Sequence, residues 1–172
     1  MEKLASLPVL HPEIDGFSIT AGNASGINDA AAAVTVASDE FAAQHGLKAL
    51  AVLRSWASVG VDPVETGLAP TLAIPKALKL AGISLADVHL FEINEAFAST
   101  PIAACRRLSI APEIVNVNGS GCSLGHPVAA TGARMIATMI YELRRRGGGT
   151  GVVSMCAGGG MGSAAVLDVA AP

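Results

Sequence analysis

The stretch Asn116-Val117-Asn118-Gly119-Ser120-Gly121-Cys122-Ser123-Leu124-Gly125-His126-Pro127 joins the two elements that decide the fold. The apolar residues 114–117, at its beginning, predict a strand. Because proline suits the first turn of a helix, Pro127 predicts the start of a long helix that runs to about Arg146. Strands joined to helices by glycine-rich turns are typical of sheets that carry helices on their faces.

The rest of the chain continues this alternation. Further strands are expected at residues 30–38, 49–57, 88–93, 152–156 and 163–169, and further helices at residues 39–45, 69–81 and 97–108. Residues 30–38 are ambiguous, because their alanines favour a helix and their Val-Thr-Val run favours a strand. We expect a strand there, since residues 39–45 already predict a helix that ends at Gly46. The sequence therefore predicts an α/β fold, with a largely parallel sheet between helices and a closing hairpin.

Composition excludes several classes of function. The 172 residues are 51% apolar and only 15% charged, which is typical of a chain whose strands are covered on both faces. A net charge of −3 gives no reason to expect nucleic acid or an anionic membrane as a partner. No stretch is apolar for the length of a membrane span. The three cysteines lack metal-ligand spacing, so we expect no metal site and a reduced, cytoplasmic setting.

His126 is the first candidate for chemistry. A histidine at this position can simply cap the following helix, and for a lone histidine that interpretation is favoured. The glycines before it change the balance, because they let a substrate approach the backbone closely. The positive end of the helix dipole is expected to keep the imidazole neutral and able to accept a proton.

Cys156 is the second candidate, at the end of the predicted strand 152–156. A small buried cysteine is commonly core filling. Here Gly158, Gly159 and Gly160 follow closely and offer free backbone N–H groups, so a thiol acid or base beside an oxyanion hole is also possible chemistry.

Two further segments contain small polar residues in loops. Asn94 follows the predicted strand 88–93, where it can cap a helix or polarise a thioester carbonyl. The segment Thr20 to Asp29 reads TAGNASGIND, which is either a plain loop or a turn against which a slender ligand lies.

The run Arg144-Arg145-Arg146 fits a solvated helix end better than a site for coenzyme phosphates. Neither glycine-rich turn, at residues 119–124 or 160–165, satisfies the dinucleotide-binding pattern.

Taken in order, the segments at residues 20–29, 94–98, 116–127 and 156–162 resemble the C-terminal half of a thiolase, an acetyl-CoA acetyltransferase or 3-ketoacyl-CoA thiolase. The resemblance extends from about Thr20 to Val166. It implies a thiolase-like C-terminal domain at residues 47–172, with a five-stranded mixed sheet between helices. Residues 1–46 would then be a remnant of the N-terminal half, with a CoA-contacting loop and its last strand.

The resemblance also implies roles for individual residues. The residue matching His126 activates a nucleophilic cysteine and helps hold a thioester oxygen, and the one matching Cys156 moves the proton at the α-carbon. Asn94 would orient a water in the first oxyanion hole, and the Gly158 N–H would contribute to the second. Contacts with CoA are implied for Ser25, which would lie along the pantetheine arm, and for Ala21, Ala96 and Phe97.

The chain also departs from the family pattern. It lacks the part of the N-terminal half in which thiolases keep their nucleophilic cysteine. Cys122 stands four residues before His126, where the family usually has an apolar residue, and we do not regard it as a replacement nucleophile. The covalent mechanism needs a nucleophile, so we expect the 172-residue chain alone to be inactive.

The sequence therefore predicts the C-terminal region of a thiolase-type acyltransferase of fatty acid metabolism. Its substrate would be a coenzyme A thioester, with no further cofactor and with a thiolase N-terminal half as a possible partner. An alternative is a non-catalytic module that binds acyl-CoA or pairs with a thiolase-like subunit. A third interpretation, which the sequence favours less, is an independent nucleotide-binding module. Homo-oligomer formation is left open.

Overall fold

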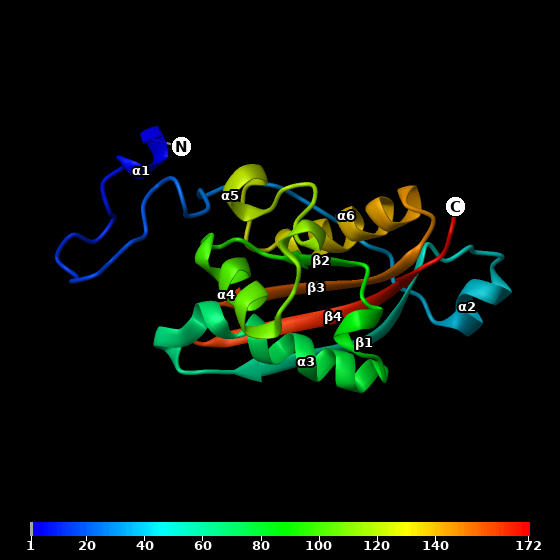
Figure 1. Cartoon of the computed structure of the whole chain (residues 1–172). Helices are drawn as coiled ribbons and strands as arrows, with labels where there is room; N and C mark the ends of the chain where they lie inside the picture. Colours follow the sequence, from blue (N-terminus) through cyan, green and yellow to red (C-terminus); the bar gives the residue numbers. More distant parts are fainter. Residues whose placement is uncertain (1) are drawn as a thin grey trace.

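The computed structural model describes residues 2–172, which form one four-stranded mixed sheet (Figure 1). The strands are β1 (Ala51–Gly60), β2 (Leu90–Ile93), β3 (Gly149–Ala157) and β4 (Met161–Val169), in the order β1-β4-β3-β2. β4 is antiparallel to both β1 and β3, and β2 is parallel to β3. The predicted α/β class and closing hairpin are confirmed. The prediction of a largely parallel sheet is wrong, because two of the three strand pairings are antiparallel.

Helices cover the two faces of this sheet (Figure 1). On one face lie α3 (Pro70–Ala81) and α4 (Ser99–Leu108), whose apolar residues share a core with Phe91, Val152 and Val166. On the other face α6 (Thr131–Arg145) packs Met135, Met139 and Leu143 against β2, β3 and β4. Alternate residues of each strand point to opposite faces, so apolar strands supply both cores at once.

Shorter elements connect the layers. They are α1 (Glu2–Ala5), α2 (Asp39–Gln44), α5 (Gly121–Leu124) and three 3₁₀ helices, η1 (Pro63–Leu68), η2 (Leu85–Asp87) and η3 (Pro112–Ile114). The predicted helices at residues 39–45, 69–81 and 97–108 thus agree with α2, α3 and α4 to within two residues at each end. Within residues 2–172, no helix is both long enough and apolar enough to cross a membrane.

Residues 30–38 are not a strand, so that prediction is wrong. They are exposed and belong to no helix or strand, and Val36 is 81% exposed. An extended segment becomes a strand only when a neighbour pairs with its N–H and C=O groups, and the described residues provide no such neighbour.

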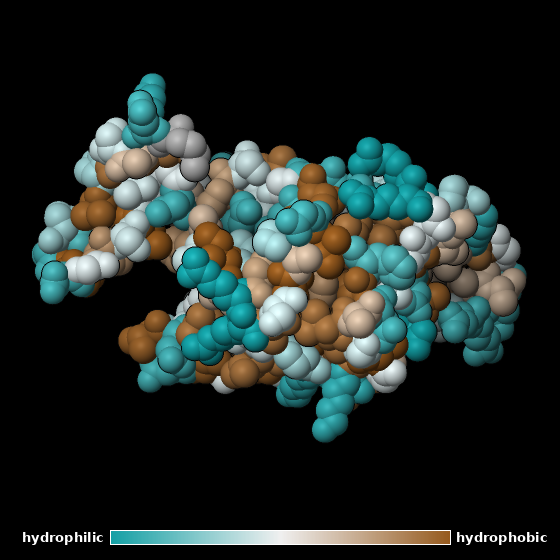
Figure 2. Space-filling view, viewed as in Figure 1, coloured by the Kyte–Doolittle hydropathy of each residue, from teal (hydrophilic) through white to brown (hydrophobic). Residues whose placement is uncertain are grey.

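The N-terminal segment, which contains α1, projects from one end of the sheet (Figure 1). Figure 2 shows the hollow between this segment and the body of the molecule.

Residues 114–117 also fail to form the predicted strand, which leaves four strands instead of the five that the resemblance implied. Only Val115 bridges to the sheet, through Phe91 of β2. Asn116 then adopts a φ of +50°, a left-handed conformation that a strand cannot continue through. Its side-chain amide takes the place of a neighbouring strand, because it accepts from the Ile93 N–H and donates to the Ile93 carbonyl, each at 2.8 Å.

The helix after His126 begins later than predicted. Residues 128–130 form a turn and α6 starts at Thr131, although the Thr131 N–H already donates to the Pro127 carbonyl at 3.0 Å. The prediction that His126 sits at or just before the N-cap of this helix is therefore wrong, since the N-cap is Ala130. This extra turn allows a side chain from the first residue of α6 to face the imidazole.

Candidate active site

Three segments that are distant in the sequence meet at His126. Its Nε2 lies 3.3 Å from Nδ2 of Asn94, which follows β2, and its Nδ1 lies 2.7 Å from Oγ1 of Thr131. Its backbone N–H donates to Oδ1 of Asn28 at 2.9 Å. Both ring nitrogens and the backbone of His126 are therefore fixed, which is what a positioned acid or base requires.

Burial lowers the pKa of His126, and the positive charge of Arg134 lowers it further. The lowered pKa favours the neutral imidazole near pH 7, and the desolvated ring and the Arg134 guanidinium both contribute to it.

Asn94 is fully buried at the end of β2. Its backbone N–H donates to the Ser154 carbonyl of β3 at 2.9 Å, so Asn94 connects His126 to the strand that carries Cys156. Its Oδ1 is buried and has no hydrogen-bond partner within the described part of the chain. A buried amide oxygen without a partner is costly, so this atom is available to a water or a ligand group.

Glu95 holds the loop that precedes His126. Its carboxylate accepts from the Cys122 N–H at 3.1 Å and from Nδ2 of Asn116 at 3.3 Å. Gly121 fits tightly beneath it, since a Cβ added there would lie 2.4 Å from the Glu95 carbonyl oxygen. The loop between β2 and α4 and the loop before His126 are therefore locked together.

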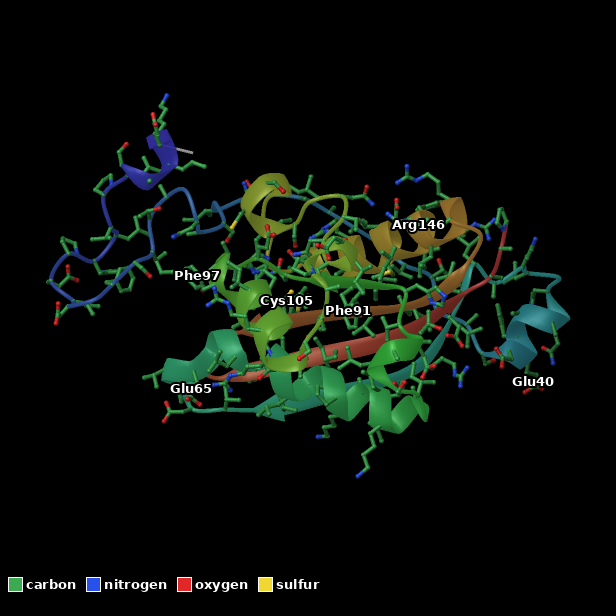
Figure 3. All side chains as sticks on the ribbon, in the orientation of Figure 1. Glu40, Glu65, Phe91, Phe97, Cys105 and Arg146 are labelled. Carbon is green, nitrogen blue, oxygen red and sulfur yellow. The ribbon has the colours of Figure 1, made fainter. Side chains whose placement is uncertain are left out.

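The segment at residues 20–29 lies against the loop after Asn94. The Ser25 N–H donates to the Ala96 carbonyl at 2.9 Å, and Ala24 pairs with Phe97 in an isolated antiparallel bridge. Figure 3 shows Phe97 beside the N-terminal segment, at the beginning of α4. Ser25, Ala96 and Phe97 are thus brought together, whereas Ala21 lies in an exposed turn next to them.

Cys156 lies in β3, is buried and has a free thiol. Burial raises its pKa, and Thr100 of α4 partly offsets this. Gly158 lies in the exposed turn that follows, where a Cβ would meet open space, so its backbone is accessible to a ligand. No hydrogen bond joins Cys156 to His126 within residues 2–172, and their shared role stays a prediction.

Cys122 is a poor nucleophile in this setting. Burial and the nearby Glu95 carboxylate both raise its pKa, so the thiol keeps its proton.

The arginines at the end of α6 do not belong to the site. Figure 3 shows Arg146 at the far end of that helix, where Arg145 and Arg146 pair with Glu142.

Comparison with known proteins identifies the family. Residues 47–169 match the family described as "Thiolase, C-terminal domain". The chain belongs to the thiolase family. A "3-ketoacyl CoA thiolase 1, peroxisomal" from Petunia hybrida is 51% identical over 169 residues, which are 96% of this chain and 36% of that protein. An "Acetyl-CoA acetyltransferase" from Syntrophomonas wolfei is 50% identical over 155 residues, 89% of this chain and 39% of that protein.

Solved thiolase structures agree with this fold. The acetyl-CoA acetyltransferase from Bacillus anthracis has a TM-score of 0.93 at 45% identity, over 98% of this chain and 42% of that one. The human mitochondrial 3-ketoacyl-CoA thiolase in complex with CoA has a TM-score of 0.88 at 38% identity, over 99% of this chain and 43% of that one. The chain thus spans little more than a third of the length of the curated thiolases it matches.

Several residues that contact the candidate site were not assigned to it from the sequence. They are Asn28, Asn116, Thr131 and the buried pair Glu92–Arg134, which is joined at 3.0 Å. Each acts through a side-chain contact with a residue at least five positions away, and a pattern read along the chain does not show such contacts. One signal existed for Thr131, a hydroxyl residue early in the long helix that follows a candidate histidine.

Proposed function

We propose that this site is the acid–base half of a thiolase active centre, which acts on acyl-CoA thioesters. The contact between Asn94 and His126 carries the proposal, because it joins two of the four segments at 3.3 Å across 32 residues of sequence. The lowered pKa of His126 supports it, since a base must be neutral to accept a proton.

In the proposed mechanism, His126 accepts the thiol proton of a nucleophilic cysteine that lies outside these 172 residues. The thiolate attacks the acyl carbon of an acyl-CoA thioester to form an acyl–enzyme and expels CoA, which takes the proton back from His126, and the Asn94 amide and its water face the thioester oxygen. In thiolysis the same acyl–enzyme forms when the bond between the 3-keto carbon and the α-carbon of a 3-ketoacyl-CoA breaks, and free CoA then takes the acyl group. Cys156 exchanges the proton at the α-carbon of the second acyl-CoA. Its raised pKa suits this role in thiolysis, where a thiol that holds its proton delivers it to the departing α-carbon.

The remaining site residues would bind the substrate. The exposed turn at Gly158 offers its N–H as the second oxyanion donor. Ser25, Ala96 and Phe97, with Ala21 beside them, would line the pantetheine arm of CoA. Two solved thiolases of this fold are described as complexes with CoA, which supports a CoA thioester as substrate.

A cytoplasmic location is a separate proposal that rests on the free thiols of all three cysteines.

Complementation tests this function. The chain is mixed with the separately expressed N-terminal half of the Bacillus anthracis enzyme, and the CoA-dependent loss of acetoacetyl-CoA is followed. We expect turnover from the mixture and none from either part alone. His126→Ala should lower the turnover by about 10²–10⁴-fold. His89→Ala, on an exposed position away from the site, is the control and should change nothing.

A non-catalytic partner module is the second candidate, and one surface favours it. The sheet face beside α6 carries an open apolar groove lined by Trp56, Ile136 and Met155, and Trp56 is 70% exposed. Such a face suits the apolar surface of a thiolase-like subunit. Stable assembly with the N-terminal half, with unchanged activity in His126→Ala, would support this module and contradict the catalytic proposal.

A further inference from the structure

We propose that Thr131 is a positioning residue that fixes His126 as the Nδ1–H tautomer and thereby leaves the Nε2 lone pair as the base. The catalytic meaning of this inference rests on the proposed function, whereas the tautomer itself does not.

The Thr131 hydroxyl has one hydrogen, and its contact with a carbonyl indicates where that hydrogen lies. The side chain is fully buried, and Oγ1 lies 3.0 Å from the Pro127 carbonyl oxygen. A carbonyl oxygen only accepts, so the hydroxyl is the donor at this contact. Oγ1 also lies 2.7 Å from Nδ1 of His126. While the hydroxyl donates to the carbonyl, Oγ1 accepts from the ring, which places the proton on Nδ1.

The opposite side of the ring agrees with this arrangement. Nδ2 of Asn94 carries two donors and no acceptor, and it lies 3.3 Å from Nε2. With the amide in this orientation, Nε2 presents its lone pair. Two contacts, made by residues from α6 and from the end of β2, are thus consistent with the same tautomer.

This arrangement has a chemical consequence. When Nε2 takes the thiol proton of the nucleophile, the imidazolium keeps its Nδ1–H bond to Thr131, and the Pro127 carbonyl stabilises the hydroxyl that accepts it. No proton has to leave Nδ1 during the step. Without the hydroxyl, a fraction of the rings would carry the proton on Nε2 and could not act as the base.

The tautomer can be measured on the chain alone. Long-range ¹H–¹⁵N correlation spectra of the ¹⁵N-labelled protein above pH 7.5 distinguish Nδ1–H from Nε2–H rings, and His126→Gln assigns the signals. The chain contains an internal reference, because Nδ1 of His89 accepts from the Thr150 N–H at 3.1 Å and requires the Nε2–H form. We expect opposite patterns for His126 and His89.

Two variants then isolate the hydroxyl. Thr131→Val should shift His126 to a mixture that contains the Nε2–H form, whereas Thr131→Ser should keep the Nδ1–H form. In the complemented enzyme, Thr131→Val should lower kcat about tenfold or more with little change in KM, and Thr131→Ser should restore it. Circular dichroism and unchanged His89 signals show that each variant is folded.

An Nε2–H ring at His126 in the unmodified chain would overturn the inference. So would a tautomer that is unchanged in folded Thr131→Val. An inactive complemented enzyme with the expected spectra would instead count against the proposed function alone, because the spectra do not depend on turnover.

Discussion

Asn28 accepts a hydrogen bond from the backbone N–H of His126 at 2.9 Å, across 98 residues of sequence. The side chain of Asn28 lies so close to the turn that a Cβ on Gly125 would meet its Cγ at 2.8 Å. Residues 26–40 are exposed, so burial does not explain this contact. Asn28 also lies outside residues 47–169, which match the family domain. The site is therefore completed by Asn28, which belongs to a segment that precedes the thiolase C-terminal domain in the sequence.

We expect Asn28→Ala to release the turn that carries His126. The backbone N–H loses its acceptor, so its hydrogen exchange should accelerate about tenfold, a change that corresponds to about 1.4 kcal/mol. Asn28→Asp keeps the acceptor and should keep the protection, while its negative charge raises the pKa of His126. Asp29→Ala, at the next exposed position, is the control. Unchanged hydrogen exchange of the His126 backbone N–H in Asn28→Ala would show that this hydrogen bond does not stabilise the turn.

Arg134→Gln should raise the pKa of His126. The guanidinium disfavours the imidazolium, and removing it leaves only burial to lower the pKa. NMR titration of the His126 ring measures this directly. Arg54→Gln is a matched control, because Arg54 pairs with Asp168 on the surface, and it should leave the titration of His126 unchanged. A His126 pKa that stays constant in Arg134→Gln would mean that burial alone lowers it.

The sequence predicted elements well where local chemistry determines them. Helix α2 ends two residues before Gly46 and helix α3 ends directly before Gly82, and both glycines have a positive φ. The apolar runs of β3 and β4 form the closing hairpin. The two incorrect strands have different causes, because residues 30–38 lack a neighbour to pair with, whereas residues 114–117 lie beside β2 and are interrupted by the left-handed conformation of Asn116. Strand formation depends on a partner in space, and residue type does not reveal whether one is present.

The site was predicted in the same uneven way. His126 and Asn94 could be found because glycine-rich turns and strand ends mark them. Thr131 and Arg134 could not, since their effect on His126 depends on the turn at residues 128–130, which the sequence did not predict.

Gly121→Ala should destabilise the fold by about 1–3 kcal/mol, because the new Cβ would lie 2.4 Å from the Glu95 carbonyl oxygen, and backbone cannot move aside cheaply. Urea unfolding followed by circular dichroism gives the free energy of unfolding. Gly60→Ala is the matched control, since a Cβ there meets nothing within 4 Å. Equal stability of the two variants would show that α5 shifts freely against the loop at Glu95.

Two buried glutamates, Glu92 and Glu142, make the stability of the fold depend on pH in opposite directions. Burial raises the pKa of Glu92 to about 7, although Arg134 opposes this, so the folded state binds that proton more tightly than the unfolded chain does. Its contribution is fully present below pH 4.5 and is lost as the pH rises through about 7. Hydrogen bonds from Arg145, Asn118 and Arg146 lower the pKa of Glu142 to about 2. That contribution is present above pH 4.5 and is lost as the pH falls towards 2.

The two effects are separated by Glu92→Gln and Glu142→Gln, with the free energy of unfolding measured from pH 3 to pH 8. Relative to Glu92→Gln, the unmodified chain should lose up to roughly 3 kcal/mol between pH 4.5 and pH 7.5, because the glutamine cannot ionise. Relative to Glu142→Gln, it should gain stability as the pH rises from 3 to 5 and stay constant above that. A difference between the unmodified chain and Glu92→Gln that does not depend on pH would mean that Glu92 titrates as an ordinary carboxyl group, and that Arg134 fully compensates for its burial.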